Sequence, residues 1–324
     1  MADRISSGRG KWALAAVLAA AAMALGVIFR SEIAYAFSEF RGYLAYPFIR
    51  RALAVGLSVS LCAALLGVSL VLKRYSMIGD GLSHVGFGAL AVAMALGYVG
   101  ASSPFYGIAR AIAGQPIIFT MAVVMLAAVL LLRLNSFSRI RGDAAIAILS
   151  TGALALGVVV VSVTDGMNID IANYMFGSIL SVSDSDVAYS LILCGAVLIL
   201  FAAFYHRIFA VTFDEGFARA TGVRAGAYNM LLAGLTAVTI VMGMRLMGTM
   251  LISSLIIFPA LTAMRVFSRF RQVVICAAAV SAACFMIGLM LSCVYSLPTG
   301  AAVVAVNIVA FAVFHVIGMI RGTR

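Results

Sequence analysis

The chain has 324 residues, of which 65% are hydrophobic and only 10% are charged, and its mean hydropathy is +1.16. Soluble domains carry about 25% charged residues, so this composition excludes a water-soluble globule and indicates an integral membrane protein built from many helices. The 22 basic and 11 acidic residues give a net charge of +11, which we attribute to arginine-rich cytoplasmic loops rather than to nucleic-acid binding.

Apolar runs separated by polar breaks predict an all-α, polytopic fold with about nine or ten transmembrane helices. The candidate spans are residues 12–29, 51–72, 82–100, 116–134, 144–163, 187–205, 228–246, 247–264, 272–294 and 300–320. The first follows a basic start and could also be a signal peptide, although it is long enough to cross a membrane. Only Arg245 and Gly248 separate the seventh span from the eighth.

The distribution of charge predicts the orientation of these spans. If both termini are cytoplasmic, most of the basic residues fall in cytoplasmic segments, as the positive-inside rule requires. The segment from residue 164 to residue 186 would then lie outside, and it carries four acids and no base: Asp165, Asp170, Asp184 and Asp186. We therefore predict a multi-pass protein of the cytoplasmic membrane with its N and C termini in the cytoplasm.

The stretch "MIGDGLSHVGFGALA" at residues 77–91 places Asp80 and His84 four residues apart. Residues at i and i+4 of a helix are neighbours on one face, so a carboxylate and an imidazole could hold one cation together. This mixture suits Zn²⁺ or Mn²⁺ better than Cu(I), but further ligands would have to come from elsewhere in the chain, a second subunit or water. The alternative is an ordinary cytoplasmic turn in which Asp80 caps the next helix, and residue types alone do not separate the two.

The stretch "VTFDEGFARATGVRAGAYN" at residues 211–229 predicts a short cytoplasmic helix. Thr212 and Glu215 have the spacing of a capping box, and Gly222 is a typical C-terminal stop. A helix of about nine residues fits between them and is too short to cross a membrane. Its aromatic and charged side chains suit docking to another protein, and the alternative is a helix that lies on the membrane surface.

Three absences limit the chemistry of the chain. The nearest approach to the ATP-binding loop G-x-x-x-x-G-K-[ST] is "SGRGKW", where Trp12 stands at the position that needs Ser or Thr. The energy for active transport would therefore come from a partner or an ion gradient. The metalloprotease motif H-E-x-x-H is also absent, and the five cysteines form no C-x-x-C pair, so we expect neither a disulfide nor a cysteine metal site.

Taken together, these stretches resemble the metal-cation permeases of bacterial ATP-binding-cassette importers, which carry zinc, manganese or iron. The matching motifs, in chain order, are "VLKRYSMIGDGLSHVGFG", "IANYMFGSILSVSDSD", "VTFDEGFARATGVRAGAYN", "MGTMLISSLIIFPALTA" and "YSLPTGA". The resemblance divides the chain into an N-terminal extension with the first transmembrane helix, residues 1–45, and a metal-permease transmembrane domain, residues 46–324. Gly81 departs from the family's Thr or Ala, and Val85 from a common Ala; both leave Asp80 and His84 in place but could loosen the helix.

The resemblance implies a fold similar to the vitamin B12 and siderophore permeases, as a homodimer or a pseudo-symmetric pair around a central pathway. It implies a separate ATPase subunit in the cytoplasm, a periplasmic or lipoprotein metal-binding protein outside, and no nucleic-acid partner. Asp80 and His84 would help coordinate the passing cation, which is cargo and not a permanently bound cofactor. Residues 213–222 would form the coupling helix that docks on the ATPase, through positions that include Phe213, Asp214, Glu215, Ala218 and Gly222.

We therefore expect a non-enzymatic membrane subunit of an ATP-driven divalent metal importer, with zinc favoured over manganese and iron. One alternative is a cobalamin or siderophore permease, which needs no paired ligands such as Asp80 and His84. Another is a proton-coupled secondary metal transporter, which needs a relay of carboxylates within the membrane.

Overall fold

The computed structural model describes residues 39–75, 77–98, 104–137, 142–164 and 182–320. The first predicted span, residues 12–29, lies outside these ranges. Every element in the described ranges is a helix, which confirms the all-α prediction. The helices are α3 (Pro47–Leu72), α4 (Ile78–Ala95, extended by a 3-10 turn over Leu96–Tyr98), α5 (Tyr106–Gly114), α6 (Pro116–Phe137), α7 (Gly142–Val163), α9 (Asp184–Ala203), α10 (Tyr205–Phe213), α11 (Glu215–Ala220), α12 (Ala225–Met247), α13 (Thr249–Met264), α14 (Phe270–Tyr295) and α15 (Thr299–Ile320).

Within the described part of the chain, seven helices are long and apolar enough to cross a membrane: α3, α4 with its 3-10 turn, α7, α9, α12, α14 and α15. Helices α5 and α6 pass the same test as a pair that bends by 93°, and α13 is apolar but has only 16 residues. Each predicted span from residue 51 onward thus corresponds to an apolar helix. The doubtful boundary between the seventh and eighth spans is real, because Gly248 separates α12 from α13 with a φ of +88°.

Helix α3 forms the centre of the bundle and packs against α9, α12, α13 and α14. Its most apolar stretch is 78% buried, whereas the corresponding stretches of α7, α9 and α15 are at most 28% buried. These three helices therefore present most of their apolar surface outward, as expected for helices that face lipid. Close contact between α3 and α13 depends on Gly67, because a Cβ there would lie 2.1 Å from the carbonyl oxygen of Ile256.

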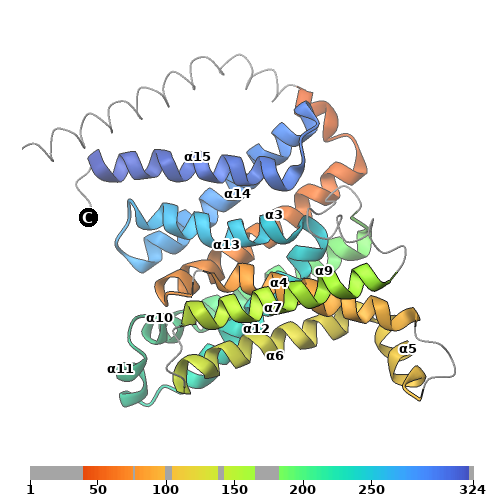
Figure 1. Cartoon of the computed structure of the whole chain (residues 1–324). Helices are drawn as coiled ribbons and strands as arrows, with labels where there is room; N and C mark the ends of the chain where they lie inside the picture. The colour runs from red at the N-terminus through yellow and green to blue at the C-terminus, as the bar shows by residue number, and fades with distance from the viewer. Residues whose placement is uncertain (1–38, 76, 99–103, 138–141, 165–181, 321–324) are drawn as a thin grey trace, which may run out of the picture.

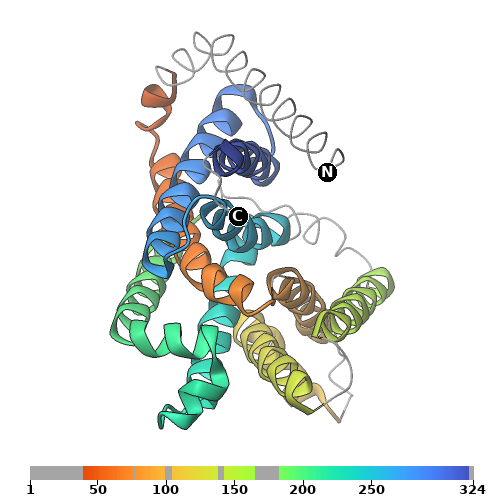
Figure 2. The ribbon, with the colours of Figure 1, turned by 90° about the vertical axis from the view of Figure 1, so that its left-hand side faces the viewer.

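The connecting segments gather at two opposite ends of the bundle (Figure 1). Helices α10 and α11 lie at the same end as the C-terminal end of α15, and α5 lies at the other end. In the perpendicular view, α6 and α7 form one flank together with α4, and α14 and α15 form the other (Figure 2). The segments predicted to be cytoplasmic, residues 206–227 and the end of the last span, therefore share one end.

Candidate functional site

The first candidate site lies in the first two turns of α4. Asp80 is the third residue of this helix, where its carboxylate favourably faces the positive end of the helix dipole. His84 Nε2 lies 3.6 Å from Asp80 Oδ1, and the His84 and Asp80 side chains are 22% and 48% exposed. The N-cap is Met77 and not Asp80, so the alternative in which Asp80 caps the helix is wrong. The structure thus brings the two predicted ligands together on one partly open face.

The pair by itself is an incomplete cation site. No third histidine, cysteine, aspartate or glutamate joins Asp80 and His84 among the residues that the structure describes. The Met244 thioether packs on α4 too, but against Gly86, where a Cβ would lie 3.2 Å from its sulfur. Gly86 is two residues beyond His84, roughly 200° around the helix at 100° per residue. Met244 therefore serves helix packing.

Gly81 has a packing role that the sequence did not reveal. A Cβ at this position would lie 2.5 Å from Cγ2 of Ile146, and one at Gly88 would lie 2.4 Å from the carbonyl oxygen of Ala153. Both neighbours belong to α7. The absence of a side chain at Gly81 therefore lets α4 approach α7 closely, and whether Gly81 also loosens the helix stays a prediction.

The second candidate site is the six-residue helix α11. Its N-cap is Asp214, whose Oδ1 accepts a hydrogen bond from the backbone N–H of Phe217 at 2.9 Å. Thr212 lies inside α10, and its buried hydroxyl has no hydrogen-bond partner. The predicted Thr212–Glu215 capping box is therefore wrong, because α10 continues through Phe213 and leaves Asp214 as the first side chain free to cap.

The predicted C-terminal stop at Gly222 is confirmed. Gly222 has a φ of +85° and donates its N–H to the carbonyl of Arg219 at 3.0 Å. Val223 donates its N–H to the carbonyl of Ala218 at 2.9 Å. These two bonds form a Schellman motif, in which the left-handed residue reverses the chain and satisfies the last carbonyls of the helix.

The predicted coupling residues take different positions on and around α11. Phe213 is 56% exposed and Phe217 is 65% exposed, so both offer aromatic surface at this end of the molecule. Ala218 is completely buried in a small cluster with Val211 and Ala225. Ala218 therefore seats the helix on α10 and α12 and is not available for contact with another protein.

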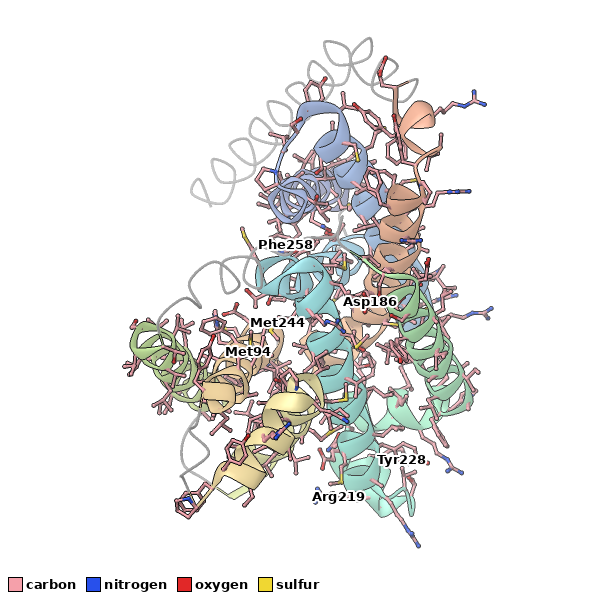
Figure 3. All side chains as sticks on the ribbon, turned by 90° about the vertical axis from the view of Figure 1, so that its right-hand side faces the viewer. Met94, Asp186, Arg219, Tyr228, Met244 and Phe258 are labelled. Carbon is pink, nitrogen blue, oxygen red and sulfur yellow. The ribbon has the colours of Figure 1, made fainter. Side chains whose placement is uncertain are left out.

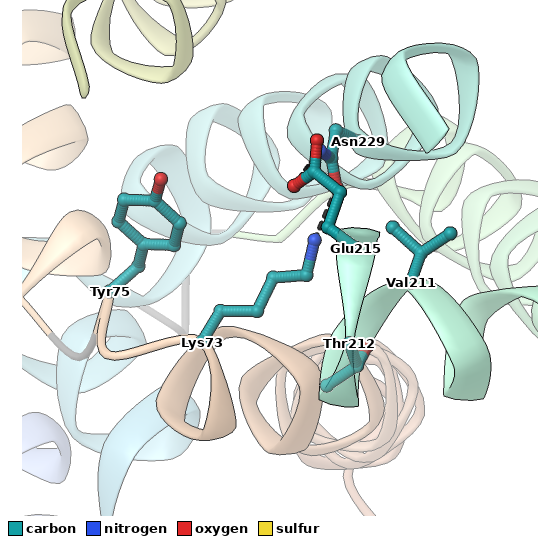
Figure 4. A pocket seen from close by; sticks show the side chains of 6 residues that line it. All are labelled: Lys73, Tyr75, Val211, Thr212, Glu215 and Asn229. Carbon is teal, nitrogen blue, oxygen red and sulfur yellow. Dashed lines mark hydrogen bonds between the residues drawn. The ribbon is translucent and has the colours of Figure 1, made fainter. Parts of the chain in front are cut away.

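Glu215 turns toward the bundle, into a hydrogen-bond network that the sequence analysis missed. Its Oε2 accepts from Nδ2 of Asn229 at 3.0 Å, and its Oε1 accepts from Arg219 at 2.5 Å. Asn229 Oδ1 accepts in turn from Nζ of Lys73. A cavity of about 200 Å³ adjoins this network (Figure 4). Its lining consists of Lys73, Tyr75, Val211, Thr212, Glu215 and Asn229.

The surroundings of Glu215 and Lys73 shift the pKa values of these two side chains. Burial alone would raise the pKa of Glu215, but hydrogen bonds from Asn229 and Arg219 and the charges of Lys73 and Arg219 lower it below the ordinary value. Burial lowers the pKa of Lys73, and the charge of Glu215 opposes that shift. No local pattern could have predicted this network, because Lys73 and Asn229 are 156 residues apart.

Two ion pairs lie toward the opposite end of the bundle. Arg245 Nη1 on α12 lies 3.3 Å from Oδ1 of Asp186 on α9, and the Asp186 side chain is only 8% exposed. Figure 3 labels Asp186 between α9 and α12. Asp186 also completes a capping box with Ser183 at the start of α9. Arg51 makes a two-pronged contact with Asp184 at 2.6 and 2.7 Å. These pairs fix the start of α9 against α12 and α3.

Comparison with known proteins gives matches along most of the chain. Residues 45–318 match the ABC 3 transport family. The manganese transport system membrane protein MntC of Listeria monocytogenes is 28% identical over 273 residues, which cover 83% of this chain and 90% of that protein. The manganese import system permease protein ScaB of Streptococcus gordonii is 26% identical over 276 residues, or 84% and 92% of the two chains.

The fold is also similar to that of a solved structure, PsaBC from Streptococcus pneumoniae in complex with Fab. The TM-score is 0.72 at 26% sequence identity, over 86% of this chain and 95% of that chain. This similarity confirms the predicted fold class.

Proposed function

Because the chain belongs to the ABC 3 transport family, we propose that it is the membrane subunit through which an ATP-driven importer passes a divalent metal ion into the cytoplasm. It is a multi-pass transport subunit and not an enzyme, and ATP hydrolysis belongs to a separate subunit. The observation that carries the proposal is the Asp80–His84 pair, a carboxylate and an imidazole 3.6 Å apart on a partly open helix face.

We propose manganese as the preferred cargo, in place of the zinc that the sequence analysis favoured. The two relatives described above, MntC and ScaB, carry manganese in their names. One carboxylate and one imidazole suit Mn²⁺ as well as Zn²⁺, so the pair does not contradict the relatives. A small pair of this kind also suits a bare ion better than a large chelate such as cobalamin.

The incomplete ligand set supports a pathway shared by two copies of the chain. A two-fold arrangement would supply two carboxylates and two imidazoles from Asp80 and His84 of each copy, enough for a complete site without a new residue type. A site of few ligands is also appropriate for transport, since the ion must leave as well as bind.

Two exposed aromatic residues, Phe213 at the end of α10 and Phe217 on α11, support docking of the ATPase at this end of the bundle. Phe213 and Phe217 offer apolar surface there. The basic residues of this end support a cytoplasmic location for it, because basic residues gather on the cytoplasmic side of membrane proteins. These are Arg207, Arg219, Arg224, Arg265, Arg269 and Arg271. The metal-binding protein would then meet the opposite end.

The test is metal uptake by vesicles that contain the complex of this chain with its ATPase and binding protein. His84→Ala and Asp80→Asn should each reduce manganese uptake by at least about tenfold, since loss of a charged ligand partner costs roughly 1.5–3 kcal/mol. His206→Ala is the matched control, because His206 is an exposed histidine on α10. ATPase co-purification should stay unchanged in all three variants. Wild-type uptake of manganese, zinc and iron by both site variants would contradict the proposed pathway.

A further inference from the structure

We propose that Lys73 and Asn229 form a polar link that carries movement of the docking helix α11 to the metal-pair helix α4. The inference rests on the proposed function and deepens it, since it names the residues that would connect ATP hydrolysis to the cation site. Lys73 and Asn229 would act as positioning residues, because neither is part of the cation pair or of the exposed aromatic surface.

The link joins the ends of three helices (Figure 4). Lys73 is the C-cap of α3, and its ammonium donates to Oδ1 of Asn229 in the second turn of α12. Asn229 Nδ2 donates to Oε2 of Glu215, the first residue of α11. A displacement of Glu215 by a bound ATPase would therefore pull on Lys73 through a single asparagine.

Three backbone hydrogen bonds hold Arg74 and Tyr75, which lie between Lys73 and α4, and the first residue of α4. Arg74 adopts a φ of +63°, and it donates its N–H to the carbonyl of Val71 at 3.0 Å while Tyr75 donates to the carbonyl of Leu70 at 2.9 Å. This pair of bonds is a Schellman motif with arginine at the left-handed position, which glycine usually takes. Tyr75 then accepts the N–H of Ile78, the first residue of α4, at 3.1 Å. Lys73 and the first turn of α4 should therefore move together.

The charge on Lys73 is costly where it lies. Burial disfavours the ammonium and lowers its pKa, and the attraction of Glu215 offsets this only in part. An uncharged side chain of similar length would be easier to bury. The ammonium therefore depends on its contacts with Asn229 and Glu215 to stay charged at this position.

A second physical route exists between the docking region and α3, and the test must separate it from the polar link. Ile208 on α10 is fully buried in an apolar cluster with Leu65 and Leu66 of α3. If this apolar contact carried the movement, removal of the polar link would leave coupling intact.

The experiment measures manganese uptake, ATP hydrolysis and ATPase co-purification for Lys73→Met, Asn229→Leu and the double variant in vesicles. If the polar link carries the movement, the ATPase should stay bound to each variant and the rate of ATP hydrolysis should stay within about twofold of the wild-type rate. Uptake should fall by about tenfold, as expected when a hydrogen bond to a charged group is lost. The double variant should be no worse than either single variant, because both remove the same bond.

Two further variants sharpen the result. Lys73→Arg keeps the charge and should restore most of the uptake per ATP. Arg224→Met removes an exposed positive charge from the same end and should behave as the wild type. If the wild-type complex fails to import manganese, the proposed function fails. If the wild type imports it and Lys73→Met does so with the same ATP consumption, or if Lys73→Met loses the ATPase, the polar link is refuted while the proposed function stands.

Discussion

Two glycines four residues apart, Gly222 and Gly226, provide a sharp test of how α11 is held in place. At both positions a Cβ would meet no heavy atom within 4 Å, so neither substitution to alanine causes a clash. They differ in backbone conformation, because Gly222 has a φ of +85° whereas Gly226 is an ordinary residue in the first turn of α12. Any difference between the two variants therefore reports the left-handed turn.

The magnitude follows from this difference. A non-glycine residue in the left-handed region costs roughly 1–2 kcal/mol, and alanine recovers about 0.4–1 kcal/mol by restricting the unfolded chain. We expect Gly222→Ala to destabilise the α11 turn by about 1 kcal/mol, which raises the population of the open form about fivefold. Gly226→Ala should be neutral or stabilise α12 by up to about 0.5 kcal/mol, since alanine is the better helix former.

Amide hydrogen exchange of the purified membrane subunit measures this opening directly. The informative amides are those of Gly222 and Val223, which bond to the carbonyls of Arg219 and Ala218. They should exchange about fivefold faster in Gly222→Ala and at the wild-type rate in Gly226→Ala. Equal protection in both variants, or equal loss of it, would show that the left-handed turn does not hold α11.

Two more predictions concern packing and pH. Gly67→Ala should destabilise the subunit by about 1–3 kcal/mol by overpacking, because its Cβ would lie 2.1 Å from the Ile256 carbonyl oxygen. Gly195→Ala is the control, since there is open space around its Cβ, and it should not destabilise the subunit. The measurement is thermal unfolding in detergent, and equal unfolding midpoints for the two variants would contradict the prediction. The depressed pKa of Glu215 means that its contacts stabilise the fold above the ordinary value of 4.5 and are lost as the pH falls through the lower folded-state pKa. Glu215→Gln should therefore lower the unfolding midpoint at pH 7, and the gap to the wild type should close as the pH falls below about 4.5; a gap that does not change with pH would contradict the assignment.

Several features of this protein could be predicted from short stretches of sequence. The membrane spans were predictable because a run of apolar residues long enough to cross the bilayer has no other favourable environment. The juxtaposition of Asp80 with His84 and the stop at Gly222 also follow from local geometry, since i,i+4 neighbours share a helix face and glycine tolerates positive φ. In each case the residues that decide the outcome lie within a few positions of one another.

The sequence was less informative where two or more nearby residues could perform the same structural role. Thr212 and Asp214 can both cap a helix, and the outcome depended on how far α10 extends before α11 begins. The role of Gly81 depended on Ile146 of α7, which the sequence places 65 positions away. A local pattern identifies residues that can perform such roles, but the packing of neighbouring helices selects among them.

The composition and the spacing of apolar runs thus determined an all-α membrane protein and the positions of its spans, because the bilayer acts on each segment separately. Only the tertiary structure decided which polar side chains meet, as Lys73 does with Asn229, and Asp186 with Arg245. Most buried polar groups pair with whichever partner the packed helices bring within hydrogen-bond distance. The way in which whole helices cross determines that partner, and it cannot be predicted from the number of residues that separate the two side chains along the chain.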